Sequence, residues 1–127
     1  MEIRVYYEDT DAGGVVYYAN YLKYFERGRT EYLRNRGLSV AAMARGGIAF
    51  PVVHVEINYR APAWQDDLLA VETDVLEIGK SSFTLTHRVL RVNDGKLLVE
   101  GKVKLACVGP GRKPIRLPEE LLQALKA

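Results

Sequence analysis

A short segment near the start of the 127-residue chain carries the residue types best suited to chemistry. Asp11 stands just before the pair Gly13 and Gly14, and a long stretch without proline follows from Asn20. The glycines permit positive φ and let a ligand approach the main chain closely. If a helix begins near Asn20, its free N–H groups favour a developing negative charge. A carboxylate beside such donors can attack a carbonyl or activate water while the donors hold the oxyanion, which is the arrangement that acyl transfer needs.

A second interpretation of this segment is structural. Asp is common in turns because its side chain bonds the nearby main chain, so Asp9 and Asp11 could both be turn caps. Seven of the eight tyrosines lie between residues 6 and 32, but aromatic side chains beside a buried helix usually belong to a core. The residue types alone therefore leave both interpretations open.

Two other motifs fail on spacing. The segment from Asp9 is similar to a calcium loop, but its fifth position is Gly13 and its twelfth is Asn20, where a bidentate Glu is needed. Residues 79–81 are similar to the end of a phosphate-binding P-loop, but the first glycine of that motif would fall at Asp74. We therefore expect neither a calcium site nor a nucleotide P-loop.

The histidines and the cysteine do not form a metal-binding pattern. His54, His87 and Cys107 fall on three separate expected strands, and no pair of them has metal-ligand spacing. The single cysteine cannot form a disulfide within the chain. We expect no metal and no redox cofactor.

Hydrophobic periodicity and helix-stop signals predict the elements that position the segment around Asp11. Apolar and aromatic residues cover much of the circumference of the first long helix, so we expect it to be largely buried. In chain order the first half predicts a strand over 2–8, a loop over 8–14, a helix over 21–36 with Asn20 as its N-cap and Gly37 as its stop, and a short helix over 39–45.

The second half of the chain predicts strands. They cover residues 53–60, 69–78, 83–92 and 97–108, with a hairpin at Asn93-Asp94-Gly95 and a short helix from Pro118. Because helices and strands are segregated, the fold class is α+β with an antiparallel sheet. One domain, residues 1–127, with one long helix packed against one curved sheet is the simplest arrangement.

Several expected strands also carry apolar residues on the alternate face. These residues are Ala70, Leu76, Leu90, Leu98 and Ala106. A lone sheet with one helix would leave that face wet, so we expect the chain to form a homo-oligomer through it.

Composition narrows the partners and the location. The formal net charge of +2 argues against a nucleic-acid partner recognised by bulk charge. No apolar run approaches the roughly 20 residues that span a bilayer, so we expect no membrane span. The first residues enter a strand pattern with no apolar signal region. Together with the single cysteine, these features predict a cytoplasmic protein.

Residues 6–21, followed by Phe25-Glu26-Arg27-Gly28-Arg29-Thr30-Glu31, closely resemble the hotdog-fold acyl-CoA thioesterases. The nearest branches are the 4-hydroxybenzoyl-CoA type and the Tol-Pal-associated type. The resemblance extends through Tyr59-Arg60-Ala61-Pro62 and Asp67 to the turn at Lys80 and the final strand. It implies an antiparallel sheet wrapped around one long central helix, paired into dimers and often tetramers.

The resemblance also implies roles for particular residues. Asp11 corresponds to the catalytic carboxylate, and Tyr18 to the residue whose backbone N–H faces the thioester carbonyl. The Tol-Pal-associated branch often has His at that position, whereas the 4-hydroxybenzoyl type has Tyr. The substrate-binding residues implied are Gly13, Gly14 and Asn20, which shape the loop, and Lys80 and Ser81, which lie where family members hold the CoA phosphates; Arg112, Lys113 and Arg116 match only by general location.

The expected activity is hydrolysis of an acyl-CoA with a short-chain or aromatic acyl group, with Asp11 as nucleophile or general base. Two alternatives stay open. One is a hotdog hydratase, which needs a carboxylate paired with a His, and no His lies near Asp11 in the sequence. The other is a module that binds or senses acyl-CoA without hydrolysing it. Lys80 could equally be a solvated turn lysine.

Overall fold

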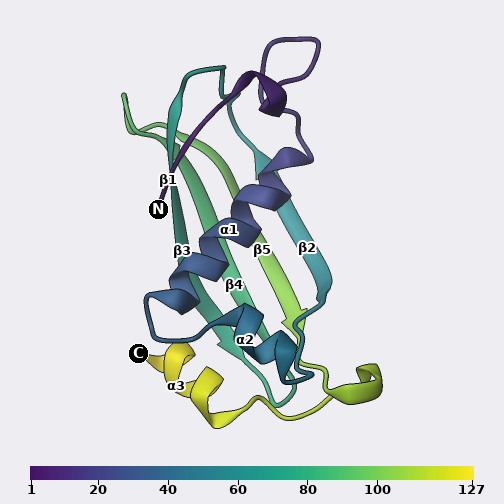
Figure 1. Cartoon of the computed structure of the whole chain (residues 1–127). Coiled ribbons are helices and arrows are strands. Elements are labelled where there is room, and N and C mark those ends of the chain that lie inside the picture. The colour runs from purple at the N-terminus through teal and green to yellow at the C-terminus, as the bar shows by residue number, and fades with distance from the viewer.

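The structure, a computed structural model, describes residues 1–127 and is built on a curved five-stranded antiparallel sheet in the order β1-β3-β4-β5-β2 (Figure 1). The strands are β1 (Glu2–Arg4), β2 (Val52–Tyr59), β3 (Leu68–Ile78), β4 (Ser82–Arg91) and β5 (Leu97–Ala106). The helices are α1 (Asn20–Arg34), α2 (Val40–Arg45) and α3 (Glu119–Lys126), and two 3₁₀ turns are η1 (Tyr7–Asp9) and η2 (Pro110–Arg112).

The four long strands and their connections confirm the prediction for the second half of the chain. β3, β4 and β5 form a meander with short turns, and β2 pairs with the far side of β5. Gly95 adopts a positive φ of 70° in the β4–β5 turn, where its N–H donates to the carbonyl of Arg91. The carboxylate of Asp94 accepts the N–H of Lys96 in the same turn. The Asn-Asp-Gly signal therefore marks the hairpin as expected.

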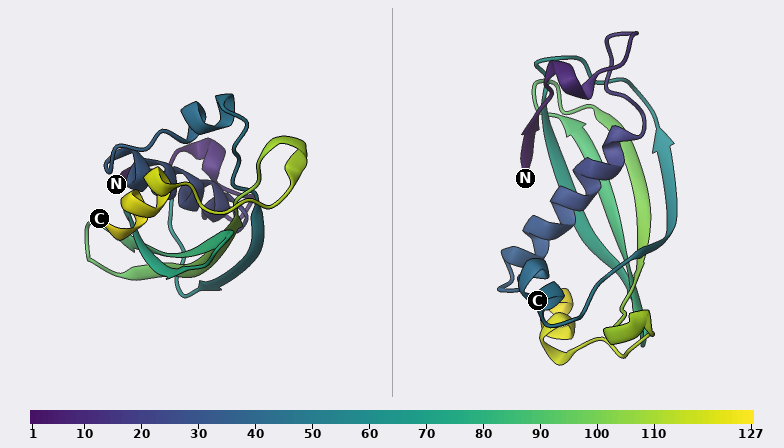
Figure 2. Two further views of the ribbon diagram at one scale, coloured as in Figure 1. Left: turned by 90° about the horizontal axis from the view of Figure 1, so that it is seen from below. Right: turned by 45° about the vertical axis from the view of Figure 1, so that its right-hand side comes forward.

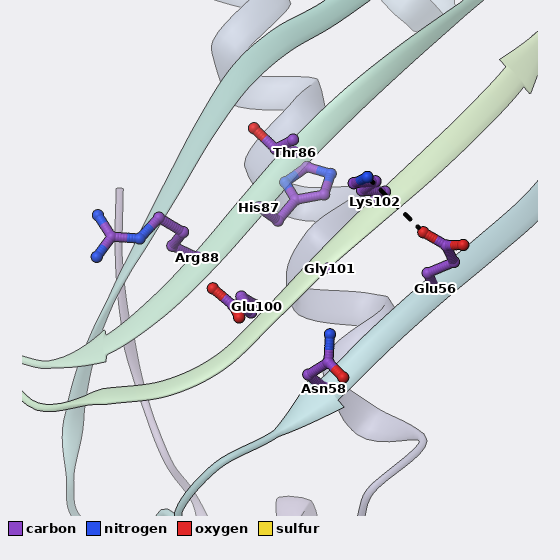
Figure 3. Close-up of a pocket in the computed structure, with 8 residues that line it drawn as sticks. All are labelled: Glu56, Asn58, Thr86, His87, Arg88, Glu100, Gly101 and Lys102. Atoms are coloured by element: carbon purple, nitrogen blue, oxygen red, sulfur yellow. Dashed lines mark ion pairs between the residues drawn. The ribbon is translucent and has the colours of Figure 1, made fainter.

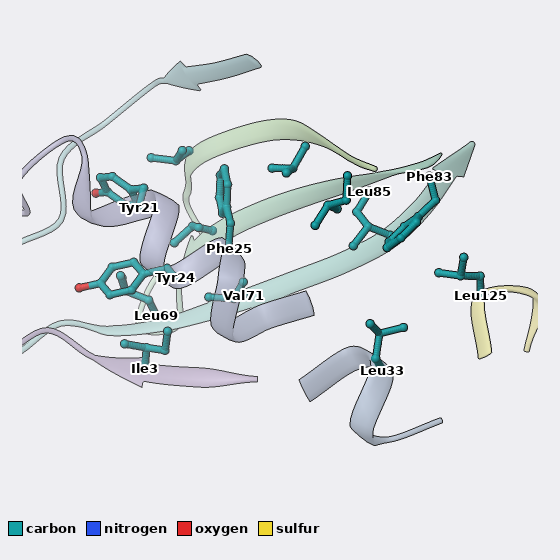
Figure 4. Close-up of a cluster of buried hydrophobic side chains, with 14 of the residues drawn as sticks. Ile3, Tyr21, Tyr24, Phe25, Leu33, Leu69, Val71, Phe83, Leu85 and Leu125 are labelled. Atoms are coloured by element: carbon teal, nitrogen blue, oxygen red, sulfur yellow. The ribbon is translucent and has the colours of Figure 1, made fainter. Parts of the chain in front are cut away.

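Helix α1 lies across the inner face of the sheet and buries its aromatic side chains there (Figures 1 and 4). Tyr24 and Phe25 are fully buried, and Leu33 at the far end of the helix is 2% exposed. The close approach depends on Gly28, since a Cβ there would lie 2.8 Å from Cγ1 of Val71 on β3. The expected burial of this helix is confirmed.

The bounds of α1 differ slightly from the prediction over 21–36. Ala19 holds the N-cap position, so Asn20 is the first helical residue and not the cap. The side chain of Asn20 is directed to Asp9 instead of to a helix N–H. At the other end the helix stops at Arg34, and Gly37 takes a positive φ of 84° just beyond it.

The inner face of the sheet is not covered by one helix alone, which corrects the prediction. Helices α2 and α3 lie on the same side of the sheet as α1 (Figure 2). Leu121 and Leu125 of α3 are buried in the same core as Leu33. Ser39 caps α2 by accepting the N–H of Ala42, and α3 begins after Pro118, as the sequence predicts.

The first strand is much shorter than the predicted 2–8. β1 pairs with β3 only over Glu2–Arg4, and the chain then turns into η1. The carboxylate of Asp9 accepts the N–H of Tyr6 at 2.8 Å and so closes this turn. A side-chain bond of this kind competes with strand pairing, and periodicity does not reveal it.

The outer face of the sheet is mostly polar. This corrects the expectation that an apolar outer face would drive oligomerisation. Leu98 is fully buried because a bulge shifts the β4–β5 register beside it. Cross-strand ion pairs occupy the outer face, among them Arg88 with Glu72 and Lys102 with Glu56. Of the apolar residues expected there, Leu76 is the one that is exposed.

No helix in the structure combines the length and the apolar character needed to cross a membrane.

Candidate functional site

Residues 9–17 form a small hairpin that presents Asp11 at its tip. Its two arms are joined by the N–H of Tyr17 donating to the carbonyl of Asp9 and by the N–H of Asp11 donating to the carbonyl of Val15, each at 2.9 Å. Gly14 closes the turn with a positive φ of 82°, which a residue with a side chain would rarely adopt. The sequence therefore holds an aspartate in an exposed position on an ordered loop.

The carboxylate of Asp11 is only partly engaged. Oδ1 accepts the N–H of Gly13 at 2.8 Å, while Oδ2 has no hydrogen-bond partner. The bond to Gly13 is the local contact that the turn-cap interpretation predicts. It uses one oxygen and leaves the other available to a substrate or a water molecule.

Tyr18 follows the hairpin directly and precedes α1. Its backbone N–H takes part in no hydrogen bond of the chain, and neither does that of Ala19. The one hydrogen bond of the Tyr18 main chain is the bond that its carbonyl accepts from the hydroxyl of Tyr59, at 3.0 Å. Free N–H groups at the start of a helix are suited to hold a partial negative charge.

Asp9 and Asn20 tie the hairpin to the start of the helix. The side-chain amide of Asn20, which is 9% exposed, donates to Oδ1 of Asp9 at 3.0 Å. The other oxygen of Asp9 accepts the N–H of Tyr6. Of the two nearby aspartates, Asp9 therefore has both carboxylate oxygens in structural bonds.

A second loop, residues 61–67, supports the hairpin from the side. The N–H of Val16 donates to the carbonyl of Ala63, and Trp64 forms a bridge with Val15. Arg91 of β4 fixes this loop by donating to the carboxylate of Asp67 at 3.1 Å and to the carbonyl of Pro62 at 2.7 Å. Hydrogen bonds thus fix both the hairpin and the loop that supports it.

Aromatic side chains surround the site. The ring centroids of Tyr17 and Tyr18 lie 4.9 Å apart, and that of Tyr59 lies 6.3 Å from Tyr18. The neighbouring phenol of Tyr18 and, to a smaller extent, the carboxylate of Asp11 raise the pKa of Tyr17. Tyr17 and Tyr18 therefore connect the hairpin of Asp11 to the aromatic contacts at the end of β2.

The structure does not bring Lys80 and Ser81 to this loop. They form the β3–β4 turn, whereas the hairpin adjoins residues at the opposite end of the strands (Figure 1). The ten residues of β4 separate these ends by roughly 33 Å. At the far end, the carbonyl of Lys80 accepts the N–H of Leu117 and that of Ser81 accepts the N–H of Cys107, while the Lys80 side chain is exposed.

Neither Asp11 nor Tyr18 lines any of the larger cavities of the single chain. A hollow of about 380 Å³ lies on the outer face of the sheet, where its charged residues already form ion pairs such as Lys102 with Glu56 (Figure 3). A cleft of about 260 Å³ between α1 and β2 is more apolar and is lined by Leu22, Phe25 and Val52 among others. The hairpin itself is an open surface in one chain.

The donor set for a metal ion is missing. No group of three or more His, Cys, Asp or Glu side chains is placed to hold one. His87 is fully buried beneath α1, and His54 is exposed on the outer face of the sheet. Neither histidine belongs to the surroundings of Asp11 described above.

Comparison with known proteins assigns the chain to a family. The family model described as "Thioesterase-like superfamily" matches residues 5–125. The chain belongs to this superfamily. The family resemblance drawn from the hairpin motif is thereby confirmed.

Individual relatives agree with the family. The chain is 41% identical over 125 residues to the acyl-CoA thioester hydrolase YbgC of Escherichia coli O6:H1, covering 98% of this chain and 92% of that protein. It is 44% identical over 124 residues to the acyl-CoA thioesterase YbgC of Haemophilus influenzae, covering 96% and 90%. The crystal structure of a 1,4-dihydroxy-2-naphthoyl-CoA thioesterase from Synechocystis superposes with a TM-score of 0.92 at 28% identity, covering 99% and 93%.

The sequence does not reveal the contacts of two residues beside the candidate site. Asp9 closes a turn, as the structural interpretation predicts, and it also joins the hairpin to the helix through Asn20. Tyr59 falls on an expected strand and within the family resemblance, but nothing in its spacing from Tyr18 predicts a contact across 41 positions. The contact becomes visible only in the structure, where the end of β2 lies beside the start of α1.

Proposed function

We propose that this protein hydrolyses the thioester bond of acyl-CoA molecules with a short-chain or aromatic acyl group. The curated relatives are named as acyl-CoA thioester hydrolases, and the Synechocystis structure is that of a thioesterase for an aromatic acyl-CoA. The observation that carries the proposal in this chain is the free Oδ2 of Asp11 on a hairpin that leads directly into a helix start, where the Tyr18 N–H has no partner. These two groups are the nucleophile or base and the oxyanion donor that acyl transfer needs.

The chemistry can run by two routes with the same residues. As nucleophile, Asp11 attacks the carbonyl carbon, CoA leaves as a thiolate, and water then cleaves the mixed anhydride to the free acid. As general base, Asp11 takes a proton from water, which attacks the carbonyl directly. In both routes the Tyr18 N–H binds the carbonyl oxygen as its negative charge develops, while Gly13 and Gly14 keep the tip narrow enough for the substrate to approach.

We infer that the working site is shared between two copies of the chain. Lys80 and Ser81 lie at the far end of the strands from Asp11, so in this proposal they hold the CoA phosphates of the partner's site. β2 is an edge strand of eight residues, and its Val53 side chain is 57% exposed. The unpaired main-chain groups of an edge strand of this length are suited to pair with an identical strand.

The charged residue beside this edge supports a dimer. Arg29 of α1 is partly buried, and it has no ion pair within 4.0 Å. It lines the cleft between α1 and β2 and a second cleft between α1, α2 and the sheet. Burial lowers the pKa of its guanidinium. The carboxylate of Glu26, which lines the same clefts, offsets part of this effect, and a second copy across β2 would supply further acceptors to the partly desolvated cation. In this dimer each α1 serves as the central helix of a hotdog domain, residues 1–127, and pairs of dimers form tetramers.

The cytoplasmic location stays a prediction.

The experiment that tests the proposed function is a thiol-release screen of the purified protein. Short-chain, long-chain and aromatic acyl-CoA esters are compared, and we expect release of CoA from the short-chain or the aromatic group. Consumption of crotonyl-CoA without thiol release would show a hydratase instead. Tight binding of esters with no thiol release over long incubation would show a binding module.

Lys80→Ala tests the role given to the turn. If the ammonium meets a CoA phosphate, KM should rise about fivefold, equal to about 1 kcal/mol, with kcat unchanged, because a partly exposed charged contact contributes to binding and not to the chemical step. Lys126→Ala, which removes a lysine from the last turn of α3, is the matched control and should leave KM unchanged. An unchanged KM in Lys80→Ala would make Lys80 a turn residue only.

A further inference from the structure

Tyr59 contacts the segment that leads into α1. It is the last residue of β2, and its hydroxyl donates to the backbone carbonyl of Tyr18 at 3.0 Å. Its ring is also held by Tyr21, with centroids 5.8 Å apart in an edge-to-face arrangement. The side chain is therefore oriented by packing at its ring and by a hydrogen bond at its tip.

This bond is the only one that the main chain of Tyr18 makes. The residues on either side are fixed by other bonds: Tyr17 donates to the carbonyl of Asp9, and Asn20 donates to the carbonyl of Tyr17. The start of α1 has no side-chain cap at Ala19 that would hold the intervening residue. Tyr18 and Ala19 are the central residues of the turn that the Asn20–Tyr17 bond closes, and within this turn the hydroxyl of Tyr59 is the one group that bonds the Tyr18 main chain directly.

We propose that Tyr59 is a positioning residue, which holds the Tyr18 backbone so that its N–H faces the substrate carbonyl. The inference rests on the proposed function, since it assigns the orientation of the donor used there. Oxyanion donors act only when they are already aimed at the charge that develops, and displacements below 1 Å reduce the rate. Burial, with a smaller effect from Tyr18, raises the pKa of Tyr59, so its hydroxyl stays protonated and donates at neutral pH.

The test is Tyr59→Phe, which removes the hydroxyl and keeps the ring. We expect kcat to fall about tenfold with KM within twofold of wild type. The pH profile of the remaining activity should keep its shape, because Tyr59 transfers no proton. Tyr32→Phe, in which a hydroxyl is removed from the other end of α1, is the matched control and should keep full activity.

A second measurement on the same variants does not depend on catalysis. Backbone ¹⁵N relaxation should show order parameters for Tyr18 and Ala19 that fall from about 0.85 to below about 0.6 in Tyr59→Phe, and no such fall in Tyr32→Phe. A wild-type protein without thiol release would overturn the proposed function, while this result would still decide whether Tyr59 orders Tyr18. Unchanged order parameters, or wild-type kcat in Tyr59→Phe, would overturn the positioning role.

Discussion

Asp9 and Asp11 lie two residues apart in the hairpin, and the structure gives them different roles. Both oxygens of Asp9 are used, by the N–H of Tyr6 and the amide of Asn20, so Asp9 holds the loop. Asp11 accepts a single N–H, from Gly13, and keeps one oxygen free. The residue types in the sequence fit either role at both positions, and the hydrogen bonds separate them.

His87 is the clearest case of a residue whose environment overrides its type. It is fully buried, stacks on Phe25 with ring centroids 4.6 Å apart, and places Nδ1 3.0 Å from the hydroxyl of Thr73. Nε2 has no hydrogen-bond partner. Burial, with a smaller effect from Arg29, lowers the pKa of His87 to about 3. The imidazole is therefore neutral at pH 7.

This shift predicts a loss of stability in mild acid. The folded-state pKa of His87 lies below the unfolded value of 6.5, so the unfolded chain binds the proton first as pH falls. The free energy of unfolding should drop by about 2 kcal/mol between pH 7.5 and pH 5 from this residue alone. In denaturant melts of His87→Met, the free energy of unfolding should fall by about 2 kcal/mol less than in wild type over the same pH range. His54→Gln, at the exposed histidine, should keep the wild-type slope, and an unchanged slope in His87→Met would contradict the account.

At the scale of elements, the strands of the sheet were predictable and the ends of elements were not. β2 to β5 follow the alternation of apolar residues because one face of each strand is buried. β1 stops early because Asp9 bonds the main chain of Tyr6, and Leu98 is buried because of a bulge. Both causes are single contacts that leave no periodic signal.

The packing of α1 on the sheet depends on Gly28, and its replacement tests that dependence. Gly28→Ala should reduce the free energy of unfolding by about 1–3 kcal/mol, because the new Cβ would lie 2.8 Å from Val71 and 3.0 Å from the hydroxyl of Thr73. The clash should outweigh the gain of about 1 kcal/mol in helix propensity. Gly46→Ala, at the end of α2, meets no atom closer than 3.4 Å and should be tolerated. A Gly28→Ala variant as stable as wild type would show that the helix has room to move.

At the scale of the whole molecule, the candidate site is split between two ends. The sequence motif located Asp11 and Tyr18, and position in the family suggested Lys80, but a linear pattern does not tell whether such residues meet. In one chain they do not, because β4 separates them along its length. The cavities of the single chain also leave the hairpin open. Two copies joined in antiparallel fashion at β2 would bring opposite ends together.

A charge on the free edge tests this assembly. Wild-type protein should have a hydrodynamic mass of at least twice the 14.3 kDa of the chain. Val53→Lys should shift the mass toward that of a single chain and abolish thiol release, because a lysine on an edge strand opposes pairing. Leu76→Lys places the same charge at another exposed apolar residue, away from β2, and should keep both mass and activity. A monomeric wild type with full activity would refute the shared site.

The central claim is that the Asp11 carboxylate performs the chemistry, and the most direct measurement is the kcat of Asp11→Asn. The amide oxygen can still accept the N–H of Gly13, so the hairpin and the oligomer should stay intact in thermal melts and mass measurements. An amide can neither accept a proton from water nor form an anhydride. We predict that kcat for thiol release falls about 10²- to 10⁴-fold while affinity for the acyl-CoA hardly changes. A kcat near that of wild type in a folded Asp11→Asn protein would contradict the catalytic role of Asp11.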